Sequence, residues 1–171
     1  AMKTFAREDL INFLRVLDVT LASPFEMILI GGTAAALAYN VSRATRDIDV
    51  ISHIDGALDS YKIAQEKTGL KIPIEVVTVH DAPFEYEGRL MLIKEFKFQN
   101  LVLKVPEIHD LILMKTVRGY EHDFEVIEEM IALNKVSKDI LKERIKNEMS
   151  HVIGNPKVLK VKYEALLELF G

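Results

Sequence analysis

Apolar residues recur at helical spacing near the start of the chain and then in strand-like runs. The segment from Glu8 to Leu21 predicts an amphipathic helix, because every third or fourth position is apolar and Pro24 follows it. The short, mostly apolar run from Phe25 to Ile30 predicts a buried strand. The pair Gly31-Gly32 interrupts this run, so we expect a tight turn there, followed by a small-residue helix from Thr33 to Tyr39.

Alternation with a period of two predicts a further strand. Acidic and aliphatic residues alternate from Asp47 to Ser52, as in a strand with two different faces. A helix from about Gly56 to Lys67 then leads to a third strand, Ile72 to Val79. Two later strands, Leu90 to Ile93 and Leu101 to Val105, are close enough along the chain to pair with each other.

After Pro106 the pattern predicts helices only. They are expected at Glu107 to Arg118, His122 to Leu133, Ser137 to Met149 and Pro156 to Phe170. We therefore expect an α/β core in residues 1–105 and a helical C-terminal subdomain in residues 106–171. No linker separates the two parts, so they should form a single compact unit.

Composition limits the class of protein. Of the 171 residues, 49% are hydrophobic, which is enough for one domain with a real core. Cysteine is absent, which excludes disulfides, a thiol nucleophile and thiolate zinc sites and favours the cytoplasm. No apolar run reaches the roughly 20 residues of a membrane span, and acidic residues stand where a signal peptide would be apolar. A net charge of −4 argues against nucleic-acid binding driven by overall charge, while a local basic patch stays open.

Asp47 and Asp49 are the first candidates for chemistry. They lie two residues apart in a predicted strand, so both side chains leave the same face. Carboxylates about 7 Å apart along a strand repel each other unless a cation lies between them. Oxygen ligands of this kind suit Mg²⁺, which takes its remaining ligands from water and substrate phosphates. An isolated D-x-D pair is more often a solvated strand edge, so the neighbouring residues decide the interpretation.

Gly31 and Gly32 supply that context. A strand, two glycines and a helix leave backbone N–H groups and the positive end of the helix dipole facing the turn, which suits a triphosphate. An ordinary strand-to-helix turn would need only one of the two glycines. Thr33 is expected either to cap the helix or to offer its hydroxyl to the phosphate, and Arg43 adds a cation in the loop that follows.

These residues resemble a known signature. The string GG-(x)n-R-x-T-x-D-I-D resembles the signature of nucleotidyltransferases with a DNA polymerase β-like fold. It is carried here by Gly31, Gly32, Arg43, Thr45, Asp47, Ile48 and Asp49. More narrowly, the chain is similar to the AbiEii/MenT-type group, the enzymatic toxins of toxin-antitoxin systems. The resemblance covers roughly residues 27–123 and implies an α+β fold, a mixed sheet flanked by helices, with a helical C-terminal half.

The match departs from the family at two points. The usual Gly-Ser of the superfamily is Gly31-Gly32 here, so the serine hydroxyl that reaches phosphate is missing unless Thr33 replaces it. Residues 137–171 carry nothing that can be matched, and choice of acceptor usually resides in such regions.

The resemblance also implies a third acid on a later strand, and then a lysine and an aspartate on helices. Glu75 is the best third acid, because a lone carboxylate in an apolar strand needs either solvent or a polar site. Asp81, Glu85 and Glu87 are alternatives with less regular placement. Lys115 either extends from a packed helix to solvent or holds a β- or γ-phosphate. Asp123 is expected to cap its helix or to pair with Arg118 or Lys115.

The sequence thus predicts an enzyme that moves a nucleoside monophosphate from a nucleoside triphosphate to a hydroxyl acceptor. Asp47, Asp49 and Glu75 are the expected catalytic and metal-binding residues, for Mg²⁺ or in its place Mn²⁺. The expected nucleotide-binding residues are Gly31, Gly32, Thr33, Arg43 and Lys115. By resemblance, the acceptor is an RNA 3′ end such as that of tRNA, a protein hydroxyl or a small molecule, and a cognate antitoxin is a partner.

Two alternatives stay open at this point. One is a non-catalytic, antitoxin-like or regulatory nucleotide-binding module of the same fold, which the Gly-for-Ser departure allows. The other is a metal phosphohydrolase that collects ligands from the His-Asp dipeptides at residues 80–81, 109–110 and 122–123.

Overall fold

The sheet of this protein is mixed and has five strands among the residues that the computed structural model describes, 3–78 and 80–171. The strands are β1 (Phe25–Ile30), β2 (Ile48–Val50), β3 (Ile74–Val76), β4 (Met91–Leu92) and β5 (Leu101–Val105). Their order is β3-β2-β1-β5-β4, in which β1 runs parallel to β5 and antiparallel to β2, and β3 runs parallel to β2. The predicted pairing of the two late strands is confirmed, because β4 and β5 are antiparallel neighbours. Val79, the predicted end of the third strand, lies outside the described residues.

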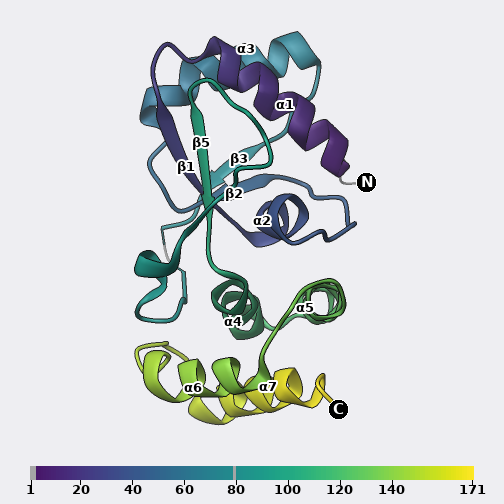
Figure 1. The fold of residues 1–171 in the computed structure, drawn as a ribbon, viewed down its shortest axis with the longest axis vertical. Helices are drawn as coiled ribbons and strands as arrows, with labels where there is room; N and C mark the ends of the chain where they lie inside the picture. The colour runs from purple at the N-terminus through teal and green to yellow at the C-terminus, as the bar shows by residue number, and fades with distance from the viewer. Residues whose placement is uncertain (1–2, 79) are drawn as a thin grey trace.

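Within the described residues, seven α-helices flank the sheet. They are α1 (Arg7–Thr20), α2 (Gly31–Ala38), α3 (Leu58–Thr68), α4 (Ile108–Arg118), α5 (Glu121–Leu133), α6 (Lys138–Glu148) and α7 (Pro156–Glu168), with short 3-10 turns η1 (Asp55–Ala57) and η2 (Tyr86–Arg89). Figure 1 shows α1 and α3 packed together above the sheet, α2 beside it, and α4 to α7 below it. The predicted α+β class is confirmed. Among the described helices, none is long and apolar enough to cross a membrane.

The apolar face of α1 anchors the upper layer. Leu10, Phe13, Leu14 and Leu17 are fully buried, as the helical spacing predicted, and each buried side chain of this kind contributes about 1.5–3 kcal/mol. Phe13 also packs edge-on against Tyr61 of α3, with ring centroids 4.8 Å apart. The upper helices therefore hold the sheet from one side.

Asp18 ties the same helix to the sheet. Its buried carboxylate accepts hydrogen bonds of 2.6–2.7 Å from the backbone N–H groups of Gln99, Asn100 and Leu101. Burial alone would raise the pKa of Asp18, but these three N–H donors hold it below its ordinary value. The contact fixes the start of β5 beside β1.

The strand-to-helix connection at Gly31 differs from the predicted two-glycine turn. Helix α2 begins directly at Gly31 instead of Thr33, and Gly31 adopts a positive φ of 65°, a backbone conformation that glycine tolerates. The N-cap is Ile30, whose side chain makes no capping hydrogen bond. The N-terminal N–H groups of α2 therefore have no side-chain cap from that position.

Candidate active site

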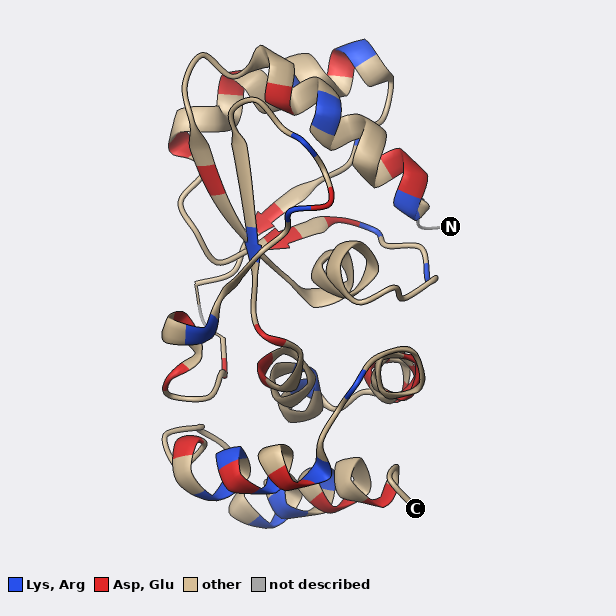
Figure 2. Cartoon of the chain, viewed as in Figure 1, with Lys and Arg blue, Asp and Glu red and all other residues tan. Residues whose placement is uncertain are grey.

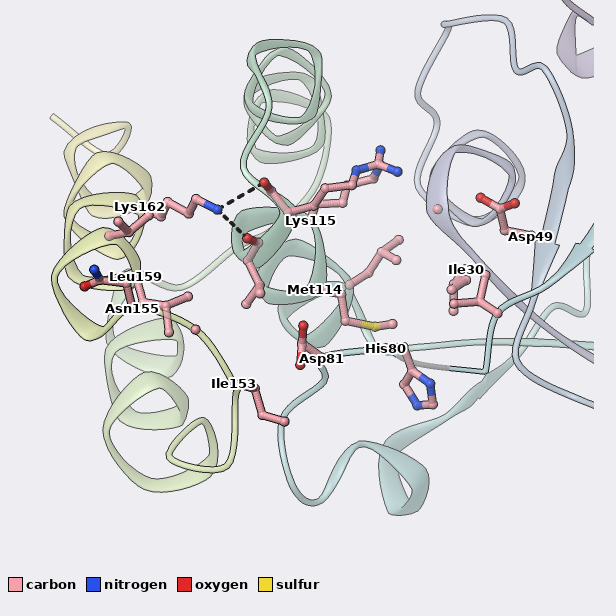
Figure 3. A pocket seen from close by; sticks show the side chains of 17 residues that line it. Ile30, Asp49, His80, Asp81, Met114, Lys115, Ile153, Asn155, Leu159 and Lys162 are labelled. Carbon is pink, nitrogen blue, oxygen red and sulfur yellow. Dashed lines mark hydrogen bonds between the residues drawn. The ribbon is translucent and has the colours of Figure 1, made fainter.

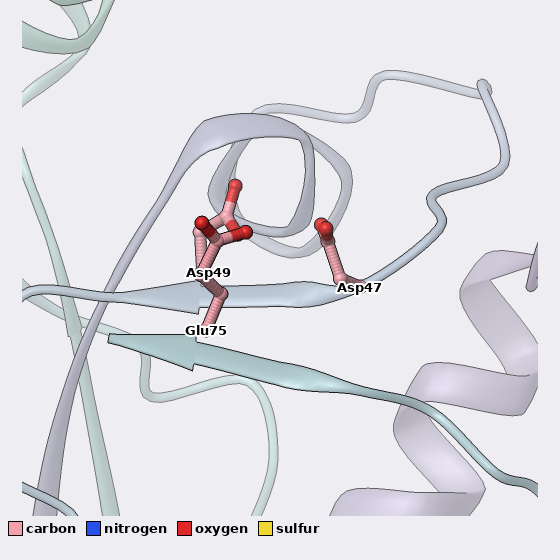
Figure 4. A group of neighbouring side chains, drawn as sticks. All are labelled: Asp47, Asp49 and Glu75. Atoms are coloured by element: carbon pink, nitrogen blue, oxygen red, sulfur yellow. The ribbon is translucent and has the colours of Figure 1, made fainter. Parts of the chain in front are cut away.

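Three carboxylates meet where β2 and β3 lie side by side, and Figure 2 shows acidic residues in red on both strands. Asp49 is the middle residue of β2 and is paired in register with Glu75 of β3, while Asp47 directly precedes β2. One oxygen of each side chain lies within 4.8 Å of the others. Figure 4 shows the three side chains rising from the same side of the two strands. In residues 3–78 and 80–171 no other group of three or more acidic or histidine side chains is placed to share a metal ion.

The loop that carries Asp47 is held by contacts from distant segments. Phe5 and Thr45 exchange two backbone hydrogen bonds, of 2.7 and 2.9 Å. The hydroxyl of Thr33 donates to the carbonyl oxygen of Asp47 over 2.9 Å, and Thr33 is only 1% exposed. This hydroxyl, expected to cap α2 or reach a phosphate, instead binds the backbone that presents Asp47.

Both glycines are explained by close packing between α2 and the acidic segment. A Cβ atom on Gly31 would lie 2.8 Å from Oδ2 of Asp49, closer than carbon and oxygen tolerate. A Cβ atom on Gly32 would lie 3.1 Å from the Thr45 methyl group, so the serine usual in the resembled superfamily would be crowded here. The pair therefore brings the start of α2 against the carboxylates.

Asp49 is the electrostatic centre of the carboxylate cluster. Burial, as the largest cause, and the charges of Asp47 and Glu75 together raise the pKa of Asp49 to about 6, against the opposing effect of Arg118. Its Oδ1 atom is buried and has no hydrogen-bond partner among the described residues. Three close carboxylates, one with an unmatched buried oxygen, have the donor chemistry that a hard divalent cation takes. These residues therefore fit a site for a divalent metal ion.

Positive charge faces the acids from α4. Lys115 is 5% exposed, and burial lowers its pKa to about 8, although Asp123 and Asp49 oppose that shift. Arg118, one turn further along, donates from Nε to both carboxylate oxygens of Asp123 at 2.8 and 3.1 Å. Asp123 is fully buried, caps α5 through the backbone N–H of Tyr120 and lies 3.9 Å from Lys115. The predicted roles of Asp123 in capping and pairing are confirmed.

Arg118 is the site residue that sequence reasoning did not assign to a site. It was expected only as a partner of Asp123, yet its charge also acts on Asp49. The available signal was its position three residues after Lys115, which places both cations on neighbouring parts of one helix surface.

Two cavities meet at the carboxylate cluster and share Asp49, Lys115 and Arg118. The first, called here the polar cavity, has a volume of about 510 Å³ and includes Asp47, Glu75 and Arg43. Arg43 also forms an ion pair with Glu125 of α5. The second, called here the apolar cavity, has a volume of about 430 Å³ and lies between the sheet, α4 and α7. Both volumes suit a small ligand or the end of a larger one.

The His-Asp dipeptides do not assemble into a metal site. His109 hydrogen-bonds to Glu107 and accepts from the backbone of Ser137, while Asp110 is fully buried and binds Arg89 and Arg144. These contacts tie η2 and α6 to α4. The phosphohydrolase alternative is therefore wrong for the described part of the chain, where the acids that come together are those of β2 and β3.

The mixed sheet and the acidic cluster beside the start of α2 define a nucleotidyltransferase fold. The chain belongs to the family described as nucleotidyltransferase of unknown function (DUF6036), whose model matches residues 8–168. That match includes the three carboxylates and the four C-terminal helices, α4 to α7. Comparison with curated proteins and with solved structures gave no significant match. The narrower AbiEii/MenT-type grouping stays a prediction.

The raised pKa of Asp49 predicts a pH-dependent stability in the absence of metal. The folded pKa of about 6 lies above the ordinary value of 3.8, so the folded state holds this proton more tightly than the unfolded state. The contribution of protonated Asp49 to the free energy of unfolding is therefore fully present below pH 4 and is lost as pH rises through 6. The loss in the free energy of unfolding is about 1–2 kcal/mol after screening by solvent.

Denaturant unfolding in the presence of a chelator, from pH 4 to pH 7, measures this loss of stability. The Asp49→Asn variant removes the titrating group, so the difference in unfolding free energy between the variant and the wild type should grow with pH in the variant's favour. A difference that is constant with pH would contradict the assigned shift.

Proposed function

We propose that this protein transfers a nucleoside monophosphate from a nucleoside triphosphate to a hydroxyl acceptor, with Mg²⁺ or Mn²⁺ as cofactor. The observation that carries the proposal is the approach of three carboxylate oxygens to within 4.8 Å of one another. Such an arrangement costs stability through repulsion, as the pKa of Asp49 indicates, and a fold retains it where a divalent cation offsets the charge.

Each residue of the site has a role in this proposal. Asp47, Asp49 and Glu75 would hold the metal, which when bound neutralises charge on the phosphates. The N–H groups that begin α2 at Gly31 and Gly32 would bind phosphate oxygens, because the helix dipole is positive there. Thr33 positions Asp47 through its backbone contact.

The cations complete the phosphate site. Lys115 offers a buried positive charge toward Asp49, and Arg118 is oriented by its contacts with Asp123. Arg43 also lines the polar cavity. Since the phosphoryl transition state is stabilised mainly by positioning and charge, these groups supply the chemistry that the reaction needs.

Glu75 is the proposed base for the acceptor. It is exposed on β3, the edge strand of the sheet, whereas Asp49 is enclosed between β1 and β3. A carboxylate at that edge can take the proton from an incoming hydroxyl group, whose oxygen then attacks the α-phosphate and displaces pyrophosphate. The acceptor therefore enters through the polar cavity.

An RNA 3′ end, such as that of tRNA, or a protein hydroxyl is the proposed acceptor. The polar cavity opens at an exposed edge strand, which allows the end of a long molecule to enter. The resemblance of the GG and D-I-D segments to toxin nucleotidyltransferases supports a cytoplasmic toxin held in check by a cognate antitoxin. In this proposal residues 1–105 carry the three acids and the start of α2, and residues 106–171 add Lys115 and Arg118 and help to select the substrates.

Transfer of label from an α-³²P nucleoside triphosphate tests the function. The protein is incubated with each of the four triphosphates, Mg²⁺ and total RNA or total protein, and the products are digested with ribonuclease or protease. Label is expected in one of the two acceptor classes. The matched Glu75→Gln variant, which keeps the size of an exposed side chain, should lose most of this transfer. Absence of label with every triphosphate would refute the proposal and favour a non-catalytic nucleotide-binding module.

A further inference from the structure

The apolar cavity is a second compartment of the site. Its walls come from three layers: Ile30 at the end of β1, Met114 on α4 and Leu159 on α7. Figure 3 shows Asp49 on the sheet side, Leu159 and Lys162 on the α7 side, and Met114 and Lys115 between them. Lys162 donates hydrogen bonds to the backbone oxygens of Val117 and Arg118, which fixes α7 against the end of α4. The cavity is thus built by the fold and opens beside Asp49.

Several groups in this cavity lack the partners expected in a folded protein. Ile153 is 91% exposed and Val158 is 49% exposed, so aliphatic surface faces solvent at the mouth. The Nδ1 atom of His80 is buried and has no hydrogen-bond partner among the described residues. Asp81 makes no hydrogen bond or ion pair with any residue in 3–78 or 80–171. A ligand with apolar faces and a polar edge would cover the exposed aliphatic side chains and offer hydrogen-bond donors to Asp81.

The position of Glu75 indicates which of the two substrates, nucleotide or acceptor, occupies the apolar cavity. Glu75, the proposed base for the acceptor, lines the polar cavity and not the apolar one. Gly31, at the start of α2, lines the apolar cavity together with Asp49, Lys115 and Arg118. Of the groups proposed to bind phosphates, Lys115 and Arg118 therefore line both cavities and Gly31 lines the apolar one, whereas Gly32 and Arg43 line the polar cavity, through which the acceptor is proposed to enter.

We propose that the apolar cavity binds the base of the nucleoside triphosphate and that Asp81 selects guanine. The inference rests on the proposed function and names its nucleotide. The flat base lies between the aliphatic side chains of α4 and α7, which stabilise it by burying its faces.

The selection follows from hydrogen-bond chemistry. A carboxylate only accepts hydrogen bonds, and guanine presents two adjacent donors, its ring N1–H and its exocyclic amino group. Adenine and cytosine each present one amino donor beside a ring nitrogen that accepts, which would face the carboxylate unfavourably. Uracil has one ring donor between two carbonyl groups. Two parallel charge-assisted hydrogen bonds to Asp81 therefore favour guanine by at least about tenfold.

Calorimetric titration of the full chain with α,β-methylene nucleoside triphosphates and Mg²⁺ tests the proposal. Wild-type protein should bind the guanosine analogue at least tenfold more tightly than the other three. Asp81→Asn should lose this preference and gain one for the xanthosine analogue, because the asparagine amide can donate to the xanthine O2 atom while its oxygen accepts from N1–H. This gain separates recognition from a loss of folding.

A pair of exposed valines on α7 tests the cavity itself. Val158 lines its mouth, whereas Val161 is 64% exposed and lies outside it. Val158→Trp should weaken nucleotide binding by at least tenfold, and Val161→Trp should leave it unchanged. Metal-dependent binding that neither Asp81→Asn nor Val158→Trp alters would overturn the base site and leave the proposed function standing. Absence of binding by wild-type protein with any triphosphate would overturn both.

Discussion

Asp49→Asn is expected to lower the rate of nucleotidyl transfer by about a thousandfold or more while raising thermal stability. The substitution keeps the shape of the side chain against Gly31 but removes the most enclosed of the three carboxylates, so metal and phosphate lose their central ligand. Stability rises because the buried, repelled charge is gone. Transfer of label and the thermal midpoint, each measured with Mg²⁺ and with a chelator, check the two effects.

Asp59→Asn is the matched control for this variant. Asp59 lies exposed in the first turn of α3, so its loss changes the net charge equally without touching the site. It should keep full transfer activity, and Mg²⁺ should raise the thermal midpoint of this control but not that of Asp49→Asn. An Asp49→Asn protein that unfolds at lower temperature than wild type would mark the carboxylate as structural.

Gly31→Ala is expected to abolish transfer and to lower stability. A left-handed backbone costs about 1–2 kcal/mol for a residue with a Cβ atom, and φ at Gly31 is 65°. The added methyl group would also meet Oδ2 of Asp49 at 2.8 Å and push that carboxylate away from Asp47 and Glu75. Denaturant unfolding and label transfer measure the two losses.

Gly69→Ala separates the two causes. Gly69 ends α3 with a nearly equal φ of 70°, but a Cβ atom there would have no atom within 4 Å. The control should therefore lose a similar amount of backbone stability and keep its activity. Equal activity in both variants would show that close contact between α2 and Asp49 is not required for transfer.

The order of elements was predictable because it depends on local periodicity. The alternation around Asp49 and the helical spacing of Leu10 to Leu17 each express burial on one side of a single element, which is a property of nearby residues. The same holds for Asp123, whose cap and ion pairs join residues within one or two helical turns. Placing Glu75 beside the two aspartates required more than local periodicity, because it depends on the pairing of β3 with β2.

The sequence by itself therefore determined the order of the elements, and the family resemblance added the α+β class and the candidate acids Asp47, Asp49 and Glu75. Only the tertiary structure showed that α2 starts at Gly31, that the hydroxyl of Thr33 binds the Asp47 carbonyl, and that a second cavity opens toward Asp81. These features join residues distant along the chain across packed layers. The period of a strand or helix specifies which face a side chain occupies, but the neighbour it meets there depends on how the layers pack.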